Sequence, residues 1–494
     1  MPLCLSRRQV LAGSASLVAS MALPGRSLAQ STPLGLTATS RTLDIDGKAA
    51  TVLGLLNSHG GQGLTLDPGQ RFRVDLINSL DVDTIIHWHG QIPPNAQDGV
   101  PGLPAPLLTP GEQRSYDYAP TPGTHWMHSH VPIQEMQLLA APLIVRSPAD
   151  LAEDRQEVVM FLHDFSFRSP QEVLAAFGSA PDGGMAGMDH SDMGHSGSMG
   201  MSAGTMQMDS MGQMGGVGME AMAMDLNDFN FDAYLTNDRT LNDPDVIAVD
   251  PGGRIRLRII NAAAATVFWI DTGAVEGQLV AVDGHGVQPL PGRRFGLSMG
   301  QRLDITLDLP PEGGAFPVLA LREGARELTG LIMASKGAAV PRIAPLGEEA
   351  APAFDYDLAQ ESALRALEPL ADRAATRSPM LMLGGSMQPY VWTINGQSWA
   401  SHVPVNAQSG ERVEITFHNM SMMAHPMHLH GHTFQVLAIN GQRFSGARRD
   451  TVQVPPMAMV TIGLDAGEAA RWMLHCHHMA HLASGMMTEF AVSA

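Results

Sequence analysis

Histidine pairs separated by one residue are the most informative chemical feature of this 494-residue sequence. With 20 histidines in the chain, chance predicts about one such pair. Residues i and i+2 of a β-strand point to the same face, so each pair would present two imidazoles to one place. Imidazole-rich sites suit Zn, Cu, Fe or Ni. The sequence contains five pairs, at 87/89, 128/130, 428/430, 430/432 and 475/477.

A cysteine near the C-terminus narrows the choice of metal. Cys476 lies between two histidines and is followed by His481 and Met486 at intervals of five residues. Blue-copper sites use two histidines, one cysteine and a long axial methionine, and His425 is the natural candidate for the second histidine. Adjacent strand residues point to opposite faces. The thiolate would therefore face one copper ion while the flanking imidazoles face another metal group.

The elements that must position these residues are predicted to be β-strands. Short runs of alternating apolar and polar residues at 71–78, 254–260 and 411–418 each follow a glycine-bearing turn and lead into an asparagine. This threefold echo predicts three related β domains, built as sandwiches or barrels, with boundaries near residues 150 and 345. Helix signals are sparse, and residues 358–367 give the best one.

Composition excludes several classes of protein. The formal net charge of −19 opposes nucleic-acid binding, which needs a basic face. Only two cysteines are present, which excludes a disulfide-rich scaffold and a cysteine-based zinc cluster.

Residues 1–29 predict an export signal of the twin-arginine type. Arg7 and Arg8 precede an apolar stretch, and small residues lead to Ala29. The alternative is a membrane anchor, but the run at 10–24 is short and rich in Gly and Ser. We expect cleavage near Ala29, a periplasmic mature protein without a stable membrane span, and Cys476 as its one remaining cysteine.

A methionine-rich insert at about 181–225 interrupts the middle unit. Residues 185–224 hold 12 of the 32 methionines, with many glycines and no aromatic residue, which predicts disorder. One interpretation is a plain linker. Because thioethers select Cu(I), we favour copper capture. The candidate ligands for substrate Cu(I) in this segment are Met185, Met188, Met193 and Met199.

Four motifs, taken together, resemble the signatures of the multicopper oxidases, and the resemblance covers essentially the whole mature chain. The motifs are His87-Trp88-His89-Gly90, His128-Ser129-His130, His425-Pro426-Met427-His428-Leu429-His430 and the Cys476 cluster. The resemblance implies an all-β fold of three cupredoxin-like domains (Greek-key β-sandwiches or barrels) at 30–150, 151–345 and 346–494, with the disordered insert in the second. The sequence from Asp98 to Gly102 and the insert look like the bacterial copper-resistance and laccase-like branch.

The resemblance also implies four copper ions and assigns their ligands. A three-copper group would lie between the first and third domains, which leaves the second mainly as a spacer. The type 1 ion would take His425, Cys476, His481 and Met486; the type 2 ion His87 and His428; and the type 3 pair His89, His128, His130, His430, His475 and His477.

The implied activity couples one-electron oxidation of a small donor to four-electron reduction of O2 to water. Asp98 matches a carboxylate that relatives place near the cluster, although it could simply form a turn before Gly99. A second carboxylate of some relatives is replaced here by Leu482. Met422 and Met423 precede the type 1 histidine where cuprous oxidases bind Cu(I), or they fill the core.

The leading hypothesis is therefore an oxidase of Cu(I) that serves copper tolerance. The alternatives are a laccase-like phenol oxidase, a ferroxidase, and a copper-storage or carrier protein without turnover. The sequence does not predict the oligomeric state.

Overall fold

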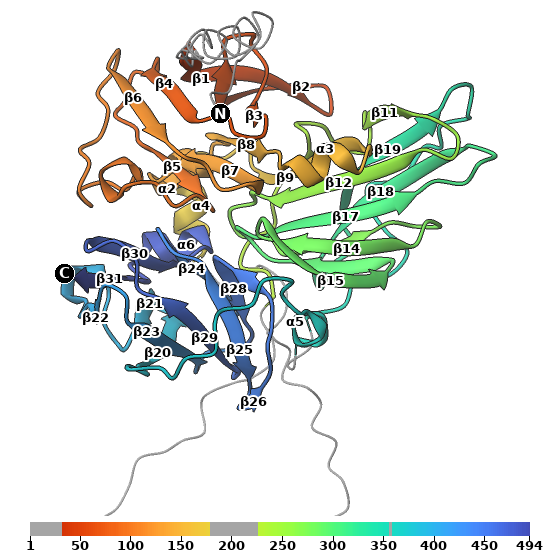
Figure 1. The fold of residues 1–494 in the computed structure, drawn as a ribbon. Coiled ribbons are helices and arrows are strands. Elements are labelled where there is room, and N and C mark those ends of the chain that lie inside the picture. The colour runs from red at the N-terminus through yellow and green to blue at the C-terminus, as the bar shows by residue number, and fades with distance from the viewer. Residues whose placement is uncertain (1–31, 178–225, 355–357) are drawn as a thin grey trace, which may run out of the picture.

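The computed structural model describes residues 32–177, 226–354 and 358–494. The predicted export signal and the methionine-rich insert lie outside the described residues. The described residues form six β-sheets, which make three pairs, and each pair encloses its own hydrophobic core (Figure 1). No described helix is long and apolar enough to span a membrane.

The first unit comprises strands β1 to β8. Its sheets have the orders β2-β1-β4-β6 and β3-β8-β7-β5. Alternating burial along β4 places Phe72, Val74 and Leu76 in the core between them. The strands are β1 (Leu34–Ile45), β2 (Lys48–Asn57), β3 (Leu64–Leu66), β4 (Phe72–Asn78), β5 (Ile86–His89), β6 (Gln113–Tyr118), β7 (Gly123–Ser129) and β8 (Ala140–Val145).

The middle unit comprises strands β9 to β19. Its sheets have the orders β10-β9-β12-β17-β14-β15 and β11-β19-β18-β13-β16. The strands are β9 (Gln156–Phe165), β10 (Ala233–Thr236), β11 (Asp245–Val249), β12 (Arg254–Asn261), β13 (Phe268–Asp271), β14 (Gly277–Val282), β15 (His285–Gly292), β16 (Arg294–Leu297), β17 (Arg302–Asp308), β18 (Ala315–Arg322) and β19 (Leu328–Ser335).

The third unit comprises strands β20 to β31. Its sheets have the orders β21-β20-β23-β29-β25-β26, with β27 also paired to β25, and β22-β31-β30-β24-β28. The strands are β20 (Met380–Met387), β21 (Tyr390–Ile394), β22 (Val405–Gln408), β23 (Arg412–Asn419), β24 (His425–Leu429), β25 (Phe434–Ile439), β26 (Gln442–Arg443), β27 (Arg448–Arg449), β28 (Thr451–Val454), β29 (Met459–Asp465), β30 (Arg471–Cys476) and β31 (Met487–Ser493).

The all-β prediction is confirmed, and the threefold echo has a structural basis. The three echoed runs are β4, β12 and β23, and each ends at a fully buried asparagine. The side-chain amides of Asn78, Asn261 and Asn419 donate to backbone carbonyls. Their carbonyl oxygens accept from the N–H two residues on. The same residue thus closes the same turn in each unit. The boundaries near 150 and 345 stay predictions, and they fall between β8 and β9 and between β19 and β20.

The predicted helix at 358–367 is wrong in extent. Only Ala359–Ala363 is helical (α5), because residues 365–367 run alongside β15 and hydrogen-bond with its backbone. The longest described helix is instead α4 (Pro170–Phe177), with Ser169 bonded to its first turn. The remaining helices are α2 (Pro132–Glu135), α3 (Pro148–Ala152), α6 (Met479–Ala483), and the 3-10 turns η1 (Asn95–Gln97) and η2 (Trp399–Ser401).

Candidate metal centre

Two strand pairs, one from the first unit and one from the third, bring the predicted histidines together. In the first unit His87 on β5 lies opposite His128 on β7. In the third, His428 on β24 lies opposite His475 on β30. Eight histidines from these strands and their ends form one buried cluster, called here the histidine cluster. They are His87, His89, His128, His130, His428, His430, His475 and His477, none more than 6% exposed.

Several ring nitrogens of the histidine cluster point at one another. The Nε2 atoms of His87 and His428 are 3.4 Å apart, and those of His430 and His475 are 3.1 Å apart. Two imidazoles on one metal ion, with bonds of about 2.0 Å, would bring their nitrogens to about this separation. Nε2 of His130 and Nε2 of His477 are buried without a protein partner. The cluster therefore fits imidazole-liganded metal ions.

Burial favours the neutral form of His428, His430 and His475. It lowers the pKa of His475 to about 3, and it lowers the pKa values of His428 and His430 well below the usual value. Neighbouring imidazoles act in the same direction, because a second positive charge nearby is unfavourable. A neutral imidazole offers a lone pair, which is the form that binds a metal.

Asp98 orients two histidines of the cluster. Its backbone carbonyl accepts from Nδ1 of His87 at 2.8 Å, and its Oδ2 accepts from Nδ1 of His430 at 2.9 Å. Both rings therefore turn Nε2 toward the cluster. Gly99 supports this placement with a positive φ of 88°, and a side chain there would collide with the backbone of Ile86. Oδ1 of Asp98 is buried and has no hydrogen-bond partner.

Two further carboxylates touch the cluster, and the sequence analysis missed both. Oδ1 of Asp450 accepts from Nε2 of His89 at 3.0 Å, which leaves Nδ1 of His89 directed at Nε2 of His128, 3.4 Å away. Oε2 of Glu135, at the end of α2, lies 2.8 Å from Nδ1 of His128. Neither residue belongs to a histidine motif. For Asp450 the one sequence signal is its position directly after Arg448 and Arg449, and Glu135 has none.

A second, smaller site surrounds Cys476. Its Sγ is 3.8 Å from Nδ1 of His425 and 3.5 Å from Nδ1 of His481, and these nitrogens are 3.1 Å apart. All three residues are 0% exposed, as is Met486, whose carbonyl accepts from the N–H of Cys476. Burial raises the pKa of the Cys476 thiol, so a bound cation is needed to favour the thiolate.

The two sites are joined by consecutive residues. Cys476 faces the smaller site, whereas His475 and His477 on either side belong to the histidine cluster. On β24 the arrangement is repeated, since Met427 lies opposite Cys476 while His428 lies opposite His475. The alternation of strand residues therefore places two metal-binding groups on opposite sides of one peptide segment.

The middle unit is more than the expected spacer, because two of its residues contact the groups around the histidine cluster. Arg302 at the start of β17 forms a two-point ion pair with Asp450, and both side chains are at most 2% exposed. Gly300 packs against the rings of His477 and His89, where an added Cβ would lie 3.0 Å and 3.3 Å from ring atoms. Arg302 thus supports the carboxylate that orients His89.

The middle unit also reaches the Cys476 site. Oδ2 of Asp228 lies 3.6 Å from Nε2 of both His481 and His478, and the hydroxyl of Tyr390 donates to it at 2.8 Å. The ring of Phe177 lies 5.7 Å from that of His478. Phe177 and Asp228 flank the segment 178–225 in sequence. The described residues on either side of that segment therefore lie near the histidines of the Cys476 site.

The other predicted residues take different positions. Met423 is 4% exposed within the core of the third unit, whereas Met422 is 40% exposed. Ser421, between Asn419 and these methionines, hydrogen-bonds Nε2 of His425 at 2.9 Å. Leu482 is buried and carries no proton donor. Met185, Met188, Met193 and Met199 lie outside the described residues.

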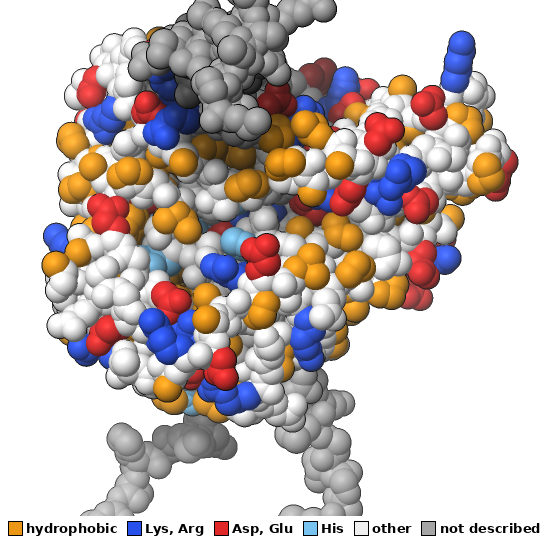
Figure 2. Space-filling view, viewed as in Figure 1, with side chains coloured by type: hydrophobic (Ala, Val, Ile, Leu, Met, Phe, Trp, Pro, Cys, Tyr) orange, Lys and Arg blue, Asp and Glu red, His pale blue; other side chains and the backbone are white. Residues whose placement is uncertain are grey.

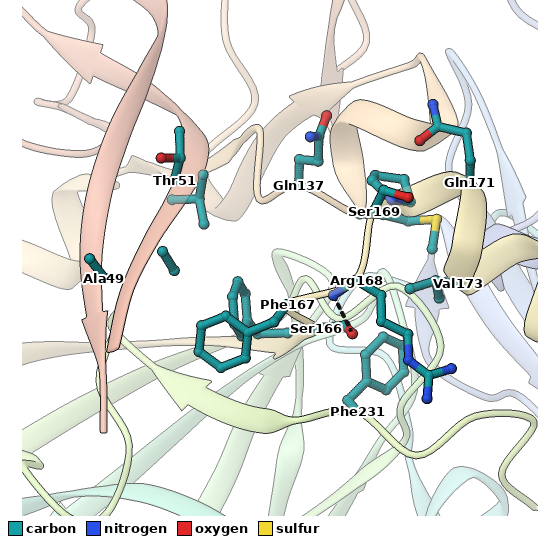
Figure 3. A pocket seen from close by; sticks show the side chains of 15 residues that line it. Ala49, Thr51, Gln137, Ser166, Phe167, Arg168, Ser169, Gln171, Val173 and Phe231 are labelled. Atoms are coloured by element: carbon teal, nitrogen blue, oxygen red, sulfur yellow. Dashed lines mark hydrogen bonds between the residues drawn. The ribbon is translucent and has the colours of Figure 1, made fainter. Parts of the chain in front are cut away.

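A surface pocket contains none of the residues of either site. It has a volume of about 430 Å³ and is lined from β2, the end of β9 and α4 (Figure 3). Phe167, Phe231 and Val173 line it together with Arg168, but it contains no His, Cys, Asp or Glu that could hold a metal ion. The metal-binding groups are instead internal, and histidine is visible at only a few points of the face in Figure 2.

Three family models described as multicopper oxidase match residues 37–150, 208–336 and 373–494. A multicopper oxidase of Mycobacterium tuberculosis is 31% identical, covering 92% of this chain and 86% of the relative. Copper resistance protein A of Escherichia coli is 25% identical, covering 96% and 94%. The crystal structure of a laccase from Botrytis aclada has a TM-score of 0.72 at 19% identity, covering 92% and 87%.

The fold and the two sites define a copper-dependent oxidase with three cupredoxin-like domains. The chain belongs to the multicopper oxidase family. Members of this family are oxidoreductases with O2 as acceptor and hold four copper ions, one of type 1, one of type 2 and two of type 3. The two buried ligand groups described above could hold these ions.

Proposed function

We propose that this oxidase takes electrons from Cu(I) and serves copper tolerance. The observation that carries the proposal is the approach of Phe177 and Asp228, which flank the methionine-rich segment, to His478 and His481. The described residues that flank a segment rich in thioethers, which select Cu(I), therefore lie beside a histidine of the Cys476 site. The similarity to copper resistance protein A supports a role in copper tolerance.

The ligand assignment is part of the proposal. When bound, the copper ions supply one-electron transfer from the donor and reduction of O2 to water. The contacts around Cys476 support a type 1 ion there, because one buried thiol beside two imidazole nitrogens is the ligand set of a blue-copper site. The proposed ligands are His425, Cys476, His481 and Met486 for type 1, His87 and His428 for type 2, and His89, His128, His130, His430, His475 and His477 for type 3.

Asp98 has two proposed roles. Its contacts with His87 and His430 hold the ring orientations that expose Nε2 to the cluster. Its buried Oδ1, which forms no hydrogen bond with a described residue and lies 3.4 Å from Nδ1 of His87, is also placed to carry a proton toward the cluster. Leu482 leaves the second proton donor unassigned at that position.

Other donors define the competing functions. A laccase-like enzyme would oxidise phenols, and a ferroxidase would oxidise Fe(II). The proteins similar to this chain include a laccase and a multicopper oxidase that functions in iron import. A storage or carrier protein would bind copper without consuming O2.

The site of action and the domain limits are also proposals. The sequence of residues 1–29 supports export to the periplasm by the twin-arginine route. We keep the domains at 30–150, 151–345 and 346–494.

The test is O2 consumption by the copper-loaded protein with Cu(I), Fe(II) and a substituted phenol. The variant replaces the twelve methionines of 185–224 by leucine, which keeps chain length and removes the thioethers. We expect Cu(I) to be the best donor and its oxidation to fall strongly in the variant, with phenol oxidation retained. Unchanged Cu(I) turnover would exclude this role for the segment, and absence of O2 consumption with any donor would exclude an oxidase.

A further inference from the structure

The outer face of a sheet in the third unit carries a row of soft metal ligands. Strands β20, β23 and β29 are neighbours in this sheet (Figure 1). Met382 on β20 lies opposite His418 on β23, and His418 lies opposite Met459 on β29. The three side chains are partly exposed, while the residues beside them in each strand are buried. One imidazole is therefore flanked by two thioethers on the solvent side.

The spacing of this row suits a single ion. Residues directly opposite each other on neighbouring strands have Cβ atoms about 4.5–5.5 Å apart. Both methionine backbones are fixed in the same way: Oδ1 of Asn395 accepts from the N–H of Met382 at 2.8 Å, and Oδ1 of Asn440 accepts from that of Met459 at 2.9 Å. The flexible thioether chains can then converge on the imidazole between them.

The His418 imidazole is available for a ligand. Among residues 32–177, 226–354 and 358–494, no side chain or carbonyl forms a hydrogen bond with it. Two more thioethers lie just beyond the paired residues, since Met420 follows β23 and Met457 precedes β29, and they are 54% and 51% exposed. The pairing continues there, because the N–H of Asn419 donates to the carbonyl of Ala458 at 2.9 Å.

We infer that Met382, His418 and Met459 form a surface binding site for Cu(I). Thioethers prefer soft Cu(I), and imidazole also suits copper. The inference deepens the proposed function and rests on it for its purpose, which is to gather substrate near the oxidase site. His418 lies near the end of β23, three residues before Ser421, whose hydroxyl contacts His425.

Methionine footprinting of the full-length, copper-loaded protein tests the site with Ag(I), a redox-inactive ion with the softness of Cu(I). Peroxide oxidises free thioethers to sulfoxides, and a metal-bound thioether is protected. Peptide mass spectrometry reads each methionine separately, so binding elsewhere in the chain does not interfere. We expect Ag(I) to suppress oxidation of Met382 and Met459. Met380, which is 52% exposed on the same strand but faces Thr416, is the internal control and should oxidise as before.

The variant His418→Gln sharpens the test. Loss of a residue that only hydrogen-bonds to a metal ligand costs about 10–100-fold in metal affinity. Loss of the His418 ligand itself should therefore raise the Ag(I) concentration that gives protection by at least about tenfold. Met380→Leu should change nothing. The site would be overturned if Ag(I) did not protect Met382 and Met459 from oxidation, or if it protected Met380 equally. The three residues would then be part of an ordinary apolar patch. Failure of the enzyme to oxidise Cu(I) would instead refute the proposed function without altering the footprint.

Discussion

Replacing Arg302 by methionine tests whether the middle unit supports the metal centre. Arg302→Met removes a charge that is 0% exposed and keeps a side chain of similar length. Asp450 then loses its ion-pair partner, whereas Asp283 keeps Arg449 at 3.1 Å. The perturbation therefore isolates one buried carboxylate that contacts His89.

The expected cost follows from the loss of the ion pair. Breaking a buried ion pair by removing one partner costs about 3–5 kcal/mol. In the native protein burial acts to raise the pKa of Asp450, but the Arg302 guanidinium and the Thr451 hydroxyl together hold the pKa below its usual value.

The assays are thermal unfolding and copper content. For a unit of the size of the middle one, a loss of about 4 kcal/mol in stability lowers the unfolding temperature by roughly 10 °C. Weakening the carboxylate that orients His89 should also lower copper affinity of the histidine cluster by about 10–100-fold, with the Cys476 site retained. Arg443→Met is the control, because its pair with Glu414 is exposed and worth at most about 1 kcal/mol. The proposed support would be refuted if Arg302→Met bound copper as tightly as the wild type and its unfolding temperature fell by less than that of Arg443→Met.

Two other perturbations give separate predictions. Burial raises the pKa of Glu323 from 4.5 to about 7, so the folded state holds a proton that the unfolded state has released, and stability falls as pH rises through this window. Glu323→Gln should therefore have a free energy of unfolding higher than that of the wild type by roughly 3 kcal/mol at pH 8, seen as a higher unfolding temperature, and no gain in stability at pH 4. An equal effect at both pH values would argue against a titrating Glu323. Gly300→Ala places a Cβ 3.0 Å from His477 at a φ of 78° and should reduce copper bound by the histidine cluster, whereas Gly337→Ala, with a φ of 82° and nothing within 4 Å, should bind copper normally. Equal copper content in these two glycine variants would contradict the packing argument.

The sequence predicted the parts of the protein that repeat or pair locally. The His-x-His pairs and the alternation around Cys476 follow from strand geometry, and the echoed runs mark β4, β12 and β23. The limits of the three domains and the type of copper at each ligand stay predictions.

The carboxylates that orient the histidines could not be found in this way. Asp450 and Glu135 reach the cluster through folding of distant segments, and Arg302 reaches it from another unit. Such contacts leave no spacing signal in one sequence. The extent of α5 was missed for a similar reason, since pairing of residues 365–367 with β15 overrides a local helical pattern.

The central claim is that Cys476 is a copper ligand joined through its neighbours to the histidine cluster. The most direct measurement is the visible absorption spectrum of the copper-loaded protein beside that of Cys476→Ser. We expect the intense blue absorption of a copper–thiolate bond in the wild type and its loss in the variant, with copper retained by the histidine cluster. A fully loaded wild type without that absorption, or a variant that keeps it, would contradict the claim.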